Sequence, residues 1–217
     1  MKNIGAILTK EFKSDFRNPY VIGGAGLFLV SSLFVCYITI KRIPITQIWV
    51  ALFWIVVLFA SFNAVAKSFL NETRARMLYL YTLVTPSEFI SAKMIYHGIV
   101  MIILGSIATL VYTTLFTIQI DDQLLFWASV ILGCTGIAFI LSLLSTIASK
   151  AGNNLTLLAI LGLPIMLPLM LVSTTLMKNA IDGIDFSVQI KYLIVLTGLN
   201  VVSFTLSIVL FPYLWRE

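Results

Sequence analysis

The chain has 217 residues, of which 60% are hydrophobic and 11% charged, and its formal net charge is +5. Its mean hydropathy of +1.04 lies far above that of soluble proteins. This composition excludes an ordinary soluble enzyme, and the placement of the cations beside apolar stretches favours a membrane surface over nucleic acid. The charged first segment is not typical of a cleaved signal peptide, and Cys36 and Cys134 fall within apolar stretches, which does not indicate a disulfide framework.

Residues 1–19 are expected to form an amphipathic helix that ends at Pro19 and lies along the inner membrane surface. At about 100° per residue, its cations fall on one arc and its large apolar side chains on the opposite arc. Glu11 and Asp15 are four residues apart and share the apolar arc. Two alternatives follow: the acids reach water from the helix margin, or they touch a partner protein or a neighbouring span.

Six apolar stretches are each long enough to cross a bilayer as a helix, because a hydrocarbon core about 30 Å thick needs roughly 20 helical residues. They cover residues 20–40, 45–66, 94–118, 123–149, 154–177 and 190–212. With the N-terminus inside, ten Lys and Arg residues lie on the cytoplasmic side and four on the far side. We therefore expect an all-α integral membrane protein, a single permease domain over residues 1–217 with both termini cytoplasmic.

The connection between the second and third spans, residues 67–93, is the longest on the cytoplasmic side. Asn71–Val84 is expected to be helical, and Thr85-Pro86-Ser87-Glu88 is typical of a capping box that begins a helix running through Lys93 into the third span. The connection is either a hairpin that only anchors two spans or a coupling surface for a cytoplasmic partner. The residues predicted to make that partner contact are Asn71, Glu72, Arg74, Arg76, Leu80, Pro86 and Glu88.

Two features stand out within the apolar spans: a pair of prolines and a small number of polar residues. Pro164 and Pro168 lie four residues apart in the fifth span, so that helix should bend or locally unwind. The prolines either set a static shape or form a hinge. Asn63 and Asn200 are expected to form hydrogen bonds between helices.

Several local patterns are similar to the CcmB-type permease of the haem-handling ABC complex in cytochrome c maturation. They are Asn18-Pro19, Ile48-Trp49-Val50-Ala51, Ala92-Lys93 followed by His97, and Leu163-Pro164-Ile165-Met166-Leu167-Pro168. Length, span number and the enlarged second connection also agree over nearly the whole chain. The connection departs from the family's usual pattern, because 71–78 lacks the Gly of Asp-Gly-Ser-Leu-Glu.

This resemblance implies an ABC-2-like exporter permease of the bacterial inner membrane, paired with a separate ATP-binding subunit and with other cytochrome c maturation membrane proteins. The sequence contains no phosphate-binding loop of its own, so ATP is expected to act through the partner. Haem is implied as substrate of the complex, with no cofactor or metal bound directly. A second copy of the chain is expected, since ABC machines need two nucleotide sites.

His97, the single histidine, lies near the cytoplasmic boundary of the third span. In a haem-linked family it is either hydrogen-bonded to a neighbouring helix or a haem contact. No Cys-x-x-Cys-His motif is present for covalent haem attachment.

Four hypotheses for the function remain open at this stage. The chain is a permease that exports haem, or an interaction subunit that uses ATP hydrolysis by its partner to release haem from a carrier protein. It is alternatively an ABC-2-like permease for a lipid or drug. An enzyme is the fourth class, and no catalytic constellation of Ser and His, paired carboxylates or metal ligands supports it.

Overall fold

The computed structural model describes residues 2–17, 20–40, 45–66, 84–150 and 155–215, and within these residues the chain is helical. Seven α-helices and one short π-helical segment are present there. Their bounds are α1 Lys2–Arg17, α2 Tyr20–Ile40, α3 Thr46–Ser61, η1 Phe62–Ala66, α6 Pro86–Leu115, α7 Gln123–Lys150, α8 Leu155–Ile181 and α9 Phe186–Trp215. Among the described residues, six helical segments are long and apolar enough to cross a membrane, α3 together with η1 forming one of them. The predicted six-span, all-helical fold is confirmed.

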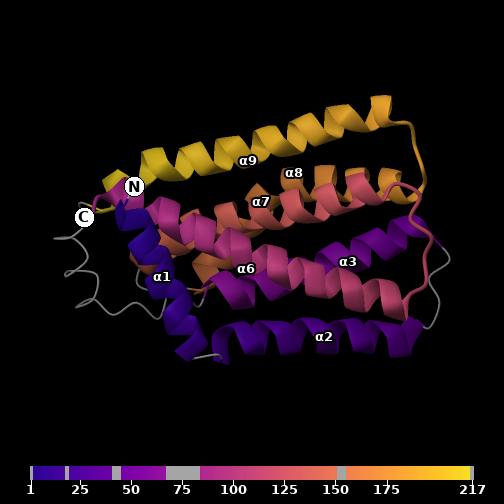
Figure 1. The fold of residues 1–217 in the computed structure, drawn as a ribbon, viewed down its shortest axis with the longest axis horizontal. Helices are drawn as coiled ribbons and strands as arrows, with labels where there is room; N and C mark the ends of the chain where they lie inside the picture. The colour runs from indigo at the N-terminus through magenta and orange to yellow at the C-terminus, as the bar shows by residue number, and fades with distance from the viewer. Residues whose placement is uncertain (1, 18–19, 41–44, 67–83, 151–154, 216–217) are drawn as a thin grey trace.

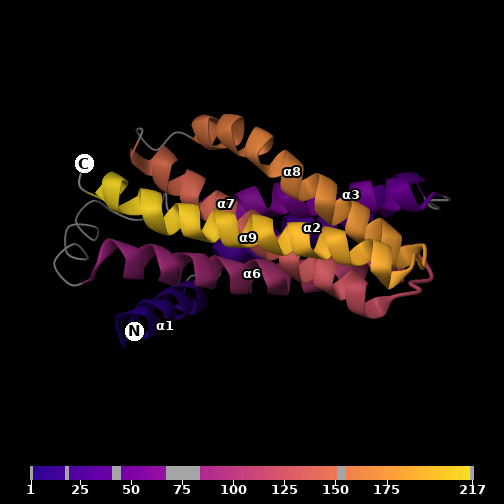
Figure 2. The same ribbon diagram turned by 90° about the horizontal axis from the view of Figure 1, so that it is seen from above.

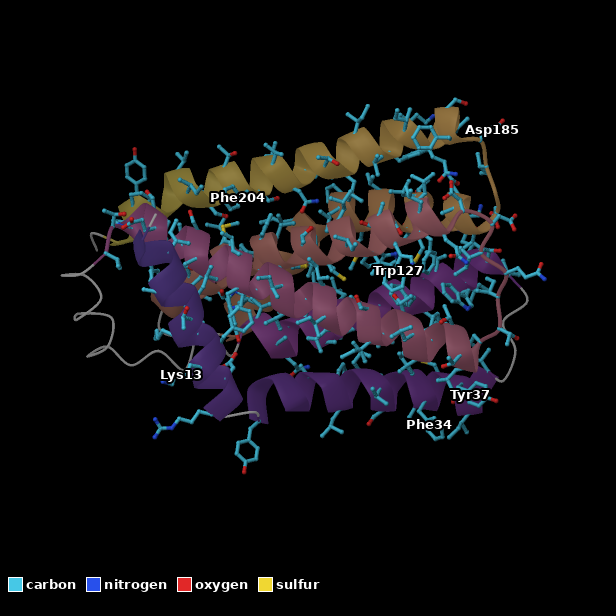
Figure 3. All side chains as sticks on the ribbon, in the orientation of Figure 1. Lys13, Phe34, Tyr37, Trp127, Asp185 and Phe204 are labelled. Atoms are coloured by element: carbon cyan, nitrogen blue, oxygen red, sulfur yellow. The ribbon has the colours of Figure 1, made fainter. Side chains whose placement is uncertain are left out.

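The long helices run side by side as an elongated bundle, while α1 lies obliquely across one end of it (Figures 1 and 2). The start of α6 and the end of α9 lie at that same end, which we name the α1 end. The turns between α6 and α7 and between α8 and α9 lie at the opposite end, which we name the far end. Figure 3 places Lys13 at the α1 end and Asp185 at the far end.

The helix α6 begins at Pro86, well before the start expected for the third span at residue 94. The predicted capping box is confirmed: the Glu88 backbone N–H donates to Thr85 Oγ1 at 3.4 Å, and the Thr85 backbone N–H donates to the Glu88 carboxylate at 3.3 Å. These bonds satisfy backbone donors that the first turn of a helix leaves open. Consequently the capped segment and the span form one continuous helix.

The centre of the bundle is filled by aromatic side chains from α3, α6 and α7. Trp49, Phe53, Trp54 and Tyr112 are almost completely buried, and the Tyr112 hydroxyl donates to the Trp49 carbonyl at 3.0 Å. Close approach of α7 depends on Gly133, because an added Cβ there would lie 2.1 Å from the Trp54 ring. The interior is therefore closely packed, as protein cores generally are.

The two asparagines differ in what they contact. Asn200 on α9 donates to the Leu132 carbonyl on α7 at 3.0 Å and accepts from the Thr135 hydroxyl at 3.1 Å, so its predicted hydrogen bonds between helices are confirmed. Asn63 donates to the Phe59 carbonyl of its own chain segment at 3.2 Å, and no hydrogen bond joins it to another helix within the described residues.

Candidate functional site

The most distinctive arrangement of polar side chains lies where α1 crosses the first turns of α6. The Lys93 ammonium is completely buried and donates to one Glu11 carboxylate oxygen at 3.0 Å. The Lys10 ammonium donates to the other Glu11 oxygen at 2.9 Å. Glu11 is itself only 5% exposed. This buried ion pair joins residues 82 positions apart in the sequence.

The charges of Lys93 and Glu11 neutralise each other within the bundle. An ammonium buried within a helical bundle is costly unless a carboxylate neutralises it. Burial alone would raise the pKa of Glu11, but the positive charges of Lys93 and Lys10 outweigh it and hold that pKa below its ordinary value. Glu11 is therefore ionised at neutral pH, and its bond to Lys93 joins two full charges.

A second contact lies one turn further along both helices. The Tyr96 hydroxyl donates to the Asp15 carboxylate, and the Phe12 ring meets the Tyr96 ring edge to face at 5.0 Å between centroids. The sequence left open whether the two acids reach water from the helix margin or touch a neighbour. In the structure both acids contact the neighbouring span. Their role as an interface for another protein stays a prediction.

The same start of α6 also contacts the end of α9. Phe89, Ile90 and Met94 are buried together with Phe211, and the Phe89 and Phe211 rings stack with centroids 5.8 Å apart. Phe89 lies next to Lys93 on α6, with the Lys93 ammonium 6.0 Å from the centre of its ring. Because neighbouring residues of α6 contact both α1 and α9, they form a junction of three helices. We name these contacts of Glu11, Asp15, Lys93, Tyr96 and Phe89 the α6 junction.

His97 continues this face of α6 into the bundle. Its side chain is 1% exposed, and Nδ1 lies 2.8 Å from the Ser142 Oγ of α7. Since the Ser142 hydroxyl donates to the Ala138 carbonyl at 2.7 Å, Nδ1 is assigned as the donor to Ser142. The described residues contain no group of three or more His, Cys, Asp or Glu side chains that could hold a metal ion. The geometry gives His97 a bond to a neighbouring helix, and the alternative of a haem contact stays a prediction.

The predicted coupling residues divide into two groups. Pro86 and Glu88 lie in the first turn of α6, where Pro86 starts the helix and the Glu88 carboxylate binds the cap. Five further residues fall within 67–83 and lie outside the described residues: Asn71, Glu72, Arg74, Arg76 and Leu80. The described chain enters this segment from η1, and π-helical turns frequently occur at functional positions.

The helix α8 continues as an α-helix across Pro164 and Pro168, so local unwinding, one of the two expected outcomes, is not seen. Both proline side chains are exposed on the outer surface of the bundle. Figure 2 shows α8 running obliquely over its neighbours. The hinge role of the two prolines stays a prediction.

Sequence reasoning missed Lys93, Tyr96 and Phe211 as site residues. A signal was present for the first two: Lys93 and Tyr96 lie one turn apart at the start of a long apolar run, on the same helix face. A lysine and a tyrosine at such positions need polar partners. Their partners are the two acids on the apolar arc of α1.

Comparison with protein families identifies the chain. The model of the family described as CcmB protein matches residues 2–213. The chain belongs to the CcmB family. None of the curated proteins compared with the chain matches it. Members of the CcmB family are membrane permease subunits of the haem-exporting ABC system of cytochrome c maturation, which also includes an ATPase and other Ccm proteins. The resemblance drawn from the sequence is therefore confirmed, and this CcmB-family chain is a multi-pass membrane protein.

Proposed function

We propose that this CcmB-family chain couples ATP hydrolysis in its partner subunit to haem export or to the release of haem from a carrier protein. The ATP-binding subunit docks at the α1 end, which faces the cytoplasm of a bacterial inner membrane. Both the last described turn before residues 67–83 and the start of α6 lie at that end. The excess of Lys and Arg expected on the cytoplasmic side supports the same orientation.

The observation that carries the proposal is the α6 junction. In this proposal, the partner subunit displaces residues 67–83, and that displacement moves the start of α6 at Pro86. Because α6 is continuous from Pro86 to Leu115, the whole helix moves with its start. The bond between Lys93 and Glu11 and the stacking of Phe89 on Phe211 then pass the displacement to α1 and α9. Packed elements of this kind move as units and do not deform continuously.

The packing of one copy favours carrier release over export through the bundle. Among the described residues, the interior is filled by apolar and aromatic side chains, including Trp49, Phe53 and Trp54. Haem moving through a single copy would have to displace them. Export therefore needs a path between two copies, while carrier release needs only the motion at the α1 end.

The experiment that separates the two versions uses the complete complex in vesicles with ATP. Haem accumulation across the bilayer identifies export, whereas haem release from the carrier without accumulation identifies the mechanical role. ATP-driven movement of a lipid or drug with no effect on haem would contradict both and favour the lipid or drug exporter.

The role of the junction is tested with a cross-link. In a variant lacking Cys36, Glu11→Cys and Lys93→Cys are joined by a short bifunctional thiol reagent. The two substitutions remove the ion pair, and the cross-link replaces it as the connection between α1 and α6. Because α1 and α6 move together in this proposal, haem handling should be at least as high after linking as in the same variant before linking. Loss of haem handling with intact ATP hydrolysis would show that α1 must separate from α6, which contradicts the proposal.

A further inference from the structure

A cavity of about 290 Å³ lies between the first turns of α3 and the last turns of α8. These turns belong to the far end of the bundle, away from the α6 junction. No part of the proposed coupling uses this cavity. The cavity is expected to lie level with the membrane boundary, because α3 begins at Thr46 and α8 ends at Ile181, close to the limits of the two spans.

The walls of the cavity have an apolar and a polar part. Val50 and Ala51 of α3 form the apolar part. Gln47 of α3 and Lys178 and Asn179 of α8 supply the polar part, and all three carry N–H donors. The arrangement fits a ligand with a negatively charged or oxygen-rich group next to an apolar body.

The two amide donors of this cavity, Gln47 and Asn179, make no hydrogen bond within the described part of the protein. Asn179 is only 7% exposed, yet no hydrogen bond joins its side-chain amide to another described residue, and the Gln47 amide also has none. Both amides line the cavity and have no hydrogen-bond partner among the described residues, so their N–H groups are available to a ligand there. In contrast, the neighbouring hydroxyls of Thr174 and Thr175 donate to the Leu171 carbonyl at 3.0 and 2.7 Å.

The electrostatics of the cavity favour an anion. The Lys178 ammonium lies 4.0 Å from the Asp182 carboxylate, both side chains are partly exposed, and this is a long contact for an ion pair. The ammonium therefore keeps the capacity to bind a second oxygen anion. Asp182 should weaken that binding by its own negative charge.

We propose that this cavity binds the head group of an anionic phospholipid from the adjacent leaflet. The phosphate oxygens accept hydrogen bonds from Lys178, Gln47 and Asn179, while the acyl chains leave the cavity along Val50 and Ala51 into the bilayer. The volume accommodates a head group and not a whole lipid. This lipid is a bound component of the protein, so the proposal holds whether or not haem is exported.

The test is lipid retention by the purified full-length protein in mild detergent, measured by native mass spectrometry with added phosphatidylglycerol. Lys178→Gln should weaken retention about fivefold, because one partly exposed cation is removed from the phosphate. Asp182→Asn should strengthen retention, because it removes the competing anion. The matched control is Lys191→Gln, which removes an exposed cation at the start of α9 outside the cavity.

Further ligands, added to the same protein, identify what the cavity binds. Glycerol phosphate, which has the head group without acyl chains, should bind much more weakly than the lipid, and phosphatidylcholine should not replace phosphatidylglycerol. Equal loss of lipid in the Lys178 and Lys191 variants, or binding of glycerol phosphate as tight as that of the lipid, would overturn the proposal. Displacement of the lipid by haemin at lower concentration would assign the cavity to the haem carboxylates and overturn it as well.

Discussion

The two ends of the bundle are held together by different kinds of interaction. At the α1 end, full charges from distant parts of the sequence meet in a buried pair, Glu11 with Lys93. At the far end, the turns are joined mainly by backbone groups: the Asp122 N–H donates to the Ala180 carbonyl at 3.0 Å, and the Ile184 N–H donates to the Asn179 carbonyl at 3.1 Å.

This difference supports the proposal that the partner subunit acts on the α1 end and not on the far end. Backbone bonds at the far end keep neighbouring helices in place with little dependence on side-chain chemistry. A buried ion pair contributes little net stability compared with apolar packing, but it fixes one arrangement of the helices that it joins. The ion pair at the α1 end therefore fixes how α1 and α6 are arranged, as the proposed coupling requires. The backbone bonds at the far end only hold the turns in place.

The largest effect is expected when one charge of the α1 end is removed. Glu11→Ala leaves the Lys93 ammonium buried without its principal partner, which should lower the free energy of unfolding by about 3–5 kcal/mol. The measurement is unfolding in mild detergent. The control Lys13→Ala removes an exposed cation from the same helix and should change this free energy little.

Exchanging the two charges tests whether the charges themselves hold α1 on α6. Glu11→Lys together with Lys93→Glu should recover much of the lost stability, because the two charges still neutralise each other. A double variant as unstable as Glu11→Ala would indicate that shape, and not charge, holds α1 on α6.

A smaller effect is expected for the second contact of the junction. Tyr96→Phe removes the hydroxyl that donates to the Asp15 carboxylate but keeps the ring that packs on Phe12. Hydrogen bonds to charged groups contribute about 1.5–3 kcal/mol, and the unfolding free energy should fall by that amount. A variant as stable as the wild type would show that Asp15 bonds to water equally well.

At the far end, the most sensitive position should be a turn glycine. Gly183 has φ of 65°, and an added Cβ would lie 2.6 Å from the Asp121 carboxylate. Gly183→Ala should therefore cost about 1–2 kcal/mol. Gly198→Ala is the control, since nothing lies within 4 Å of a Cβ there, and it should be neutral or slightly stabilising.

The smallest effect concerns pH within the ordinary range. Because the pKa of Glu11 is lower in the folded protein than its ordinary value of 4.5, its contribution to stability is present above that value and is lost as pH falls through the folded pKa. The stability difference between wild type and Glu11→Ala should be constant from about pH 8 to 6 and shrink below about pH 4.5. A difference that already shrinks near pH 6 would contradict an ionised Glu11.

Much of the fold follows from the sequence because the length of each apolar stretch determines its span, and the capping box marks the start of α6. The site follows less completely. The third span was expected to begin after Lys93, since a lysine ordinarily marks the end of a span. In the structure its charge is neutralised by Glu11, 82 positions earlier, and no local pattern specifies such a pairing. The partner contacts in 67–83 stay predictions.

The most direct test asks which end of the bundle meets the ATP-binding subunit. A photo-activated cross-linking residue is introduced in the assembled complex at position 87, in the first turn of α6, or at position 185, at the far end (Figure 3). We predict that position 87 cross-links to the ATP-binding subunit and that position 185 does not. Cross-linking of that subunit from position 185, with none from position 87, would contradict the proposed coupling.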